Sequence, residues 1–121
     1  MNVLTTTVAR VLFALPFAIF GISHFMNASA MAGVVPAWVP GGIAWVYITG
    51  LALIAASVSI ITKRQGALAC KLLALLLASF ILTIHLPALG SSQMAIINLL
   101  KDMALAGAAL HFAGIFESEE A

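Results

Sequence analysis

The distribution of apolar and polar residues divides the chain into four long hydrophobic stretches separated by short connections. The stretches cover approximately residues 7–25, 43–62, 67–86 and 95–116. Each holds about 20 residues, the length that an α-helix needs to cross a hydrocarbon layer about 30 Å thick. Their Leu and Ala runs lack the period-two alternation of membrane strands. The pattern therefore predicts an all-α fold, an integral membrane four-helix bundle formed by residues 1–121 as a single domain.

Short connections and the positions of basic residues predict the order and orientation of these helices. Residues 63–66 and 87–94 are short polar links, so consecutive helices are expected to run antiparallel, in an up-down-up-down bundle. Arg10, Lys63 and Arg64 then lie at one end, while the other two connections have no Lys or Arg. Because basic residues concentrate in cytoplasmic segments, we expect both termini on the cytoplasmic side of a bacterial inner membrane.

The connection at residues 27–42 has a different character. It has no charge, and it contains Pro36, Trp38 and Pro40. The prolines prevent a long regular helix, and tryptophan prefers the headgroup boundary, so we expect an interfacial segment that could act as a lid. The small residues 28–30 after the first apolar stretch also resemble a signal-peptide cleavage site. The stretch has the length of a full span, and we expect it to be retained.

Composition supports a membrane protein and excludes some classes of function. The chain is 64% hydrophobic and 7% charged, whereas soluble domains carry about 25% charged residues. So little polar surface means that most of the exterior must face lipid, which makes membrane lipids the first expected partner. A net charge of +1 provides no basic face for nucleic acid. Cys70 is the only cysteine, which excludes an internal disulfide and a multi-cysteine metal site.

Polar side chains from all four helices fall in the outer half of the membrane under this orientation. Lys101 and Asp102, for example, lie about 10 Å below the outer end of the fourth helix. Ionisable groups within a bilayer are costly unless they are paired or face a wet interior, and they therefore often mark functional sites. We expect a polar pocket at this depth. Its candidate ligand-binding residues are His24, Trp38, Tyr47, His85, Lys101 and Asp102.

Helical periodicity indicates which of these side chains face inward. Asp102 begins a stripe of small residues with three alanines at helical spacing, the kind of face that packs against other helices. Lys101 lies about 100° away around the helix, so its long stem could extend toward the outer headgroups. His85, and His24 beside the small Gly21, are also expected to face the centre.

Structural roles for the same residues stay open at this point. His24 and His85 could bond backbone carbonyl groups at the interface, and Lys101 could pair with Asp102. A metal site formed by His24, His85 and Asp102 has suitable ligand types but no recognisable ligand spacing, so no metal is expected. Haem ligation by the two histidines is conceivable and equally unexpected. No nucleophile–base arrangement is visible, so catalytic residues stay unassigned and an enzyme acting on its own is not expected.

Three segments resemble the DoxX-like family of small four-helix bacterial membrane proteins. They read ARVLFALPFAIFGISHF, VPAWVPGGIAWVYITGLALIAA and NLLKDMALAGAAL. The resemblance implies a four-helix bundle and, in one branch of the family, the small membrane subunit of thiosulfate:quinone oxidoreductase. Family members often carry a glutamate shortly after the glycine of the second helix. Here Gly50 is followed by Leu51, Ala52 and Leu53, which leaves Asp102 as the only acid within the spans.

Three functions are compatible with these observations. The first is a redox-associated accessory protein that binds quinone or a similar amphipathic ligand and has a larger redox subunit as its expected partner. His24 and His85 would bond carbonyl oxygens or relay protons. The second is a non-enzymatic scaffold or partner subunit whose buried polar residues are structural. The third is a small transporter. Because four helices leave little room for a pore, the transporter would require a homo-oligomer.

Overall fold

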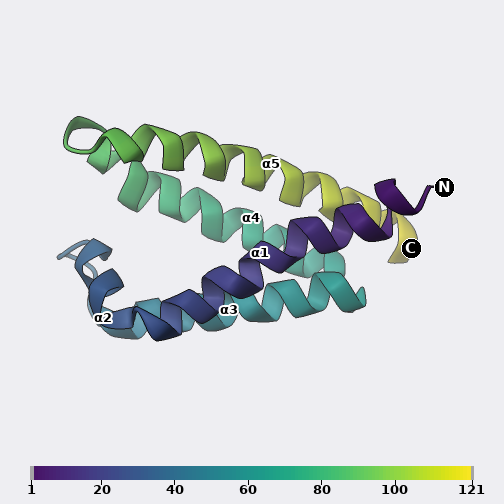
Figure 1. Ribbon diagram of the computed structural model, residues 1–121, viewed down its shortest axis with the longest axis horizontal. Helices are drawn as coiled ribbons and strands as arrows, with labels where there is room; N and C mark the ends of the chain where they lie inside the picture. Colours follow the sequence, from purple (N-terminus) through teal and green to yellow (C-terminus); the bar gives the residue numbers. More distant parts are fainter. Residues whose placement is uncertain (1, 121) are drawn as a thin grey trace.

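The computed structural model describes residues 2–120 and is all-α (Figure 1). Within that range, four helices are long and apolar enough to cross a membrane, by their length and composition. The prediction of an all-α four-helix arrangement is confirmed, and the chain is a membrane protein on this evidence. The long helices are α1 (Thr7–Met26), α3 (Ile43–Thr62), α4 (Gly66–Phe80) and α5 (Gln93–Glu120).

Short helical turns fill the connections. The chain begins with a 3₁₀ turn, Val3–Thr5, and α4 continues into a π-helical turn, Ile81–His85. The predicted interfacial connection contains α2 (Ala28–Met31) and a 3₁₀ turn, Ala32–Val34. Another 3₁₀ turn, Pro87–Gly90, precedes α5.

The long helices pack as two pairs, α1 against α3 and α4 against α5. The pairs lie close together at the end that holds both termini, and they diverge toward the end that holds α2 (Figure 1). Both termini and the α3–α4 turn lie at the same end, as expected for an up-down-up-down order.

Glycine and a buried hydroxyl bring α1 and α3 into close contact. A Cβ atom added at Gly21 would lie 2.6 Å from the carbonyl oxygen of Gly50, so the two backbones approach without room for a side chain. Two turns away, the hydroxyl of Ser57 donates a hydrogen bond of 2.8 Å to the carbonyl oxygen of Ala14. Such small-residue contacts are how membrane helices pack in the absence of a hydrophobic driving force between them.

The two pairs join through a core near the termini. The rings of Phe13 on α1 and Phe112 on α5 stack with centroids 4.7 Å apart. Gly66, the first residue of α4, lies directly against the ring of Phe116. Two exposed ion pairs also link α5 to this end, Lys63–Glu119 at 3.5 Å and Lys71–Glu117 at 3.1 Å. The largest fully buried side chains are Phe17, Ser57, Ile60, Cys70 and Leu73.

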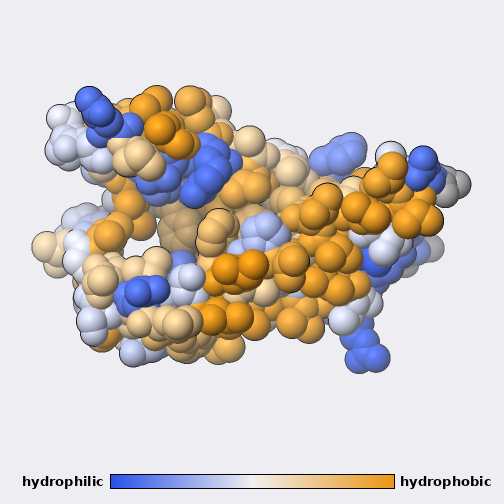
Figure 2. Space-filling view, in the orientation of Figure 1, coloured by the Kyte–Doolittle hydropathy of each residue, from blue (hydrophilic) through white to orange (hydrophobic). Residues whose placement is uncertain are grey.

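Apolar side chains cover much of the visible surface of the long helices, and polar residues gather at the two ends (Figure 2). Many large apolar side chains are exposed on all four long helices. In water such a surface would aggregate, whereas in a bilayer it meets lipid chains. At the diverging end, Figure 2 shows a hollow between the helix pairs. This hollow contains the candidate site.

Candidate ligand-binding cavity

A cavity of about 580 Å³ separates the α1–α3 pair from the α4–α5 pair at the diverging end. All four long helices and the connection between α1 and α3 contribute to its lining. Most lining residues are apolar, and the only ionisable ones among the described residues are His24, His85, Lys101 and Asp102. The volume is typical of small-molecule sites, which occupy about 300–1,000 Å³ and combine apolar walls with a few polar groups.

A buried hydrogen-bonded pair lies at the wall formed by α5 and the π-helical turn. Asp102 is only 5% exposed, and its Oδ2 atom lies 2.8 Å from Nε2 of His85. An ionised carboxylate can only accept, so Nε2–H of His85 donates this bond. The side chain of His85 is 15% exposed and that of Asp102 is 7% exposed. The predicted inward direction of both side chains agrees with this geometry.

The π-helical turn positions His85. A π turn inserts one residue into the helical register, which rotates the side chains that follow it, and such turns occur frequently at functional sites. Ile81–His85 has this geometry, and His85 is its last residue. Residues 81–85 contain no glycine or proline, so the one nearby sequence signal for the change of register is Pro87, which lacks a backbone N–H.

His24 bonds to a backbone carbonyl group, which is the structural role considered for it in the sequence analysis. Its Nδ1 atom lies 2.6 Å from the carbonyl oxygen of Phe20, one turn earlier in α1. Because a carbonyl oxygen only accepts, Nδ1–H is the donor, which leaves Nε2 as the acceptor of the neutral ring. His24 still lines the cavity. Among the residues that the structure describes, no group of three His, Cys, Asp or Glu side chains is placed to hold a metal ion.

Lys101 spans the gap between the two helix pairs. Its Nζ atom lies 5.6 Å from the centroid of the Phe20 ring, so the ammonium of α5 sits over an aromatic face of α1. Its expected extension toward the outer headgroups stays a prediction. Within residues 2–120, Asp102 is hydrogen-bonded to His85 and forms no salt bridge with Lys101.

Two predicted residues lie outside the cavity lining. Trp38 is 75% exposed, and the connection instead lines the cavity through five apolar residues: Met31, Val34, Val35, Pro36 and Val39. Tyr47 is 42% exposed and packs against the ring of Phe25, with centroids 5.5 Å apart. The lining face of α3 includes Val46 and Thr49, and Tyr47 lies on another side of the helix. Both residues lie outside this cavity, and their assignment as ligand-binding residues stays a prediction.

Uncharged polar residues complete the lining, and sequence reasoning did not select them. Asn98 and Thr83 line the cavity next to the histidine–aspartate pair. The spacing of Asn98 could have identified it, because it lies one helical turn before Asp102 and therefore on the same face of α5. The indole Nε1–H of Trp45, which also lines the cavity, donates to the carbonyl oxygen of Pro40 and thereby ties the end of the connection to α3.

Comparison with known proteins places this chain in a family. Residues 13–113 match the family model described as "Domain of unknown function (DUF8561)". The chain belongs to this family. The matched region begins in α1, ends in α5 and includes all four ionisable cavity residues. No curated protein and no solved structure matches the chain. The resemblance to DoxX-like proteins is not tested by this match and stays a prediction.

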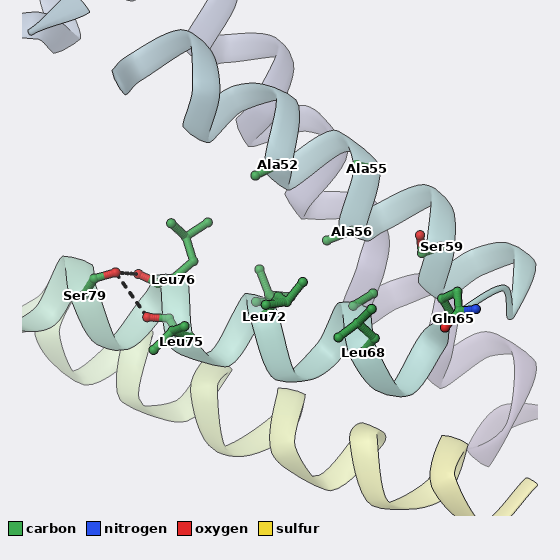
Figure 3. A pocket seen from close by; sticks show the side chains of 12 residues that line it. Ala52, Ala55, Ala56, Ser59, Gln65, Leu68, Leu72, Leu75, Leu76 and Ser79 are labelled. Carbon is green, nitrogen blue, oxygen red and sulfur yellow. Dashed lines mark hydrogen bonds between the residues drawn. The ribbon is translucent and has the colours of Figure 1, made fainter. Parts of the chain in front are cut away.

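A second hollow, of about 480 Å³, lies between α3 and α4. Figure 3 shows small side chains of α3, among them Ala52, Ala55 and Ala56, opposite leucines of α4. The hydroxyl of Ser79 donates back to carbonyl groups of its own helix, at 3.1 Å to Leu75 and 2.9 Å to Leu76 (Figure 3). This groove is therefore almost entirely apolar, unlike the cavity.

Proposed function

We propose that the protein is an accessory module of a bacterial inner membrane that binds an amphipathic ligand in the cavity between its helix pairs. The observation that carries the proposal is the buried His85–Asp102 pair, joined at 2.8 Å, in the wall of an otherwise mainly apolar cavity of about 580 Å³. In lipid, such a pair is costly to maintain unless it is fully satisfied, so it is expected to have a role.

The division of the lining matches an amphipathic molecule. The apolar side chains from α3 and α4 can accommodate a ring or an aliphatic chain, whereas Lys101 and Asn98 can donate hydrogen bonds to oxygen atoms of a headgroup. A quinone is the redox-active ligand that the resemblance to DoxX-like proteins implies. A larger redox subunit is the partner that the same resemblance implies, and it would exchange electrons with the bound quinone.

The test is a binding titration of the purified protein in a mild neutral detergent. Decylubiquinone and single-chain amphiphiles serve as probes, and mass spectrometry of the same preparation identifies any molecule that co-purifies. The Thr49→Phe variant fills the cavity from α3, because Thr49 lines it. The Leu51→Phe variant adds a ring to the same helix at a residue that is 63% exposed and does not line the cavity.

We expect Thr49→Phe to abolish binding and Leu51→Phe to leave it unchanged. Binding that survives Thr49→Phe would place the ligand elsewhere. Failure of every probe to bind, together with an empty cavity by mass spectrometry, would refute the proposal.

A structural subunit is the second candidate, and the α3–α4 groove favours it. Small residues such as Ala52, Ala55 and Ala56 let a partner helix approach closely in a membrane. If a partner chain or a second copy packs there, Ala55→Phe should dissociate the complex. Ala104→Phe, on the exposed surface of α5, is the matched control. Light scattering coupled to size-exclusion chromatography measures the outcome, and an assembly unchanged by Ala55→Phe would exclude this interface.

A further inference from the structure

The exposed charged side chain of the cavity lining is Lys101. Asp102 is buried and already bonded to His85, whereas Lys101 is exposed in the same lining. Among the described side chains, no carboxylate oxygen lies within 4.0 Å of Nζ of Lys101. Lys63 and Lys71 at the other end of the molecule do have carboxylate partners.

An ammonium without a carboxylate partner is costly at this depth of a bilayer. Lys101 lies eight residues after the start of α5, about 12 Å along the helix axis. The face of Phe20 attracts the ammonium through the quadrupole of the ring, but this offsets only part of the desolvation of a cation. An anionic group in the cavity would supply the missing compensation.

Donor groups beside Lys101 suit an oxyanion. Asn98 and Lys101 are three residues apart, so they are neighbours on the surface of α5, and both line the cavity. The amide of Asn98 has two N–H donors and the ammonium has three. The rest of the space is bounded by side chains such as Leu53, Leu76 and Leu77, which can pack along an aliphatic chain.

We infer that the ligand is an amphiphile with an oxyanion headgroup, a carboxylate or a phosphate, on an aliphatic chain. Lys101 and Asn98 bind the headgroup, and the leucine-rich wall binds the chain. The inference rests on the proposed function and narrows it, because a neutral quinone leaves Lys101 uncompensated.

Three probes with the same chain and different headgroups test this inference: dodecanoate, dodecyl phosphate and dodecanol. Dissociation constants are measured for the protein in neutral detergent. The cavity-filled Thr49→Phe variant corrects for partition of the probes into micelles. Because hydrogen bonds to charged groups contribute more than neutral ones, at least one oxyanion should bind about 10- to 100-fold more tightly than dodecanol. The tighter of the two oxyanions distinguishes a fatty-acid ligand from a lipid phosphate.

Charge variants supply the second measurement. Lys101→Gln should remove the preference, so that the ratio of oxyanion affinity to dodecanol affinity falls toward one, and Lys101→Arg should retain most of that ratio. Lys63→Gln, which removes a lysine from the opposite end, is the control and should change neither affinity. If Lys101→Gln does not fold, the headgroup series on the unmodified protein still decides.

The outcomes separate the two proposals. Equal affinity for dodecanol and both oxyanions would overturn the oxyanion inference while the proposed binding function stands. Tighter binding of decylubiquinone than of either oxyanion would have the same consequence. Failure of all these probes to bind would refute the binding function itself.

Discussion

Replacing Gly21 by alanine should force α1 and α3 apart. A Cβ atom at this position would lie 2.6 Å from the carbonyl oxygen of Gly50 and 2.5 Å from Cγ1 of Ile54. The first of these atoms belongs to backbone, which cannot rotate away as a side chain can. The helices must therefore separate by several tenths of an ångström along a contact that also positions His24 at the cavity.

The expected magnitude follows from two opposing effects. Inserting a methyl group into a well-packed contact costs about 1–3 kcal/mol, while alanine favours the helix over glycine by up to about 1 kcal/mol. The net effect of Gly21→Ala is a destabilisation of about 1–2 kcal/mol. Gly107→Ala is the matched control, because a Cβ atom at Gly107 in α5 would meet nothing within 4 Å. That variant should be unchanged or slightly more stable.

Reversible unfolding of both variants in mixed micelles, followed by circular dichroism, measures these differences. The free energy of unfolding of Gly21→Ala should be lower than that of the unmodified protein, and that of Gly107→Ala should be equal or higher. Equal stability of the two alanine variants would show that the close approach of α1 and α3 has no energetic weight.

Three further predictions concern polar contacts. A double-mutant cycle of His85→Ala and Asp102→Ala should give a coupling energy of about 1.5–3 kcal/mol, as for a hydrogen bond to a charged group. This value exceeds the roughly 0.6 kcal/mol average for hydrogen bonds between membrane helices. A coupling energy near zero would mean that the pair is not formed in lipid. Ser57→Ala should lower the free energy of unfolding by about 0.5–1.5 kcal/mol through loss of its bond to α1, and no change would contradict that bond. Glu117→Gln breaks the ion pair with Lys71, in which both side chains are more than half exposed. It should change the free energy of unfolding by less than about 0.5 kcal/mol. Thermal unfolding in detergent without added salt measures this change, and a larger loss of stability would contradict the prediction.

Much of the fold could be predicted because its determinants are local. A stretch of about 20 apolar residues is long enough to span a bilayer as a helix regardless of its neighbours, and α1 and α3 occupy the predicted stretches 7–25 and 43–62 almost residue for residue. The inward direction of Asp102 also follows from local spacing, since the alanines that share its face are buried at positions 109 and 113.

The candidate site was less predictable because its members meet across helices. His24, His85, Lys101 and Asp102 do line one cavity, but their depth in the membrane does not specify which of them pair. The rotation of each helix about its axis decides that. Tyr47 has the expected depth on α3 and nevertheless lies on a face that packs against Phe25.

The amino-acid sequence by itself determined that this chain forms four membrane-length helices and that four ionisable side chains, His24, His85, Lys101 and Asp102, lie toward the end opposite the termini. Hydrophobic length and helical period are properties of each segment alone, so no partner segment is needed to specify them. Only the tertiary structure decided that Lys101 faces Phe20 instead of Asp102, that His85 bonds to Asp102, and that the helix pairs diverge to leave a cavity. These features depend on where backbones can approach, at Gly21 and Gly50 above all, and on the rotation of each helix about its own axis.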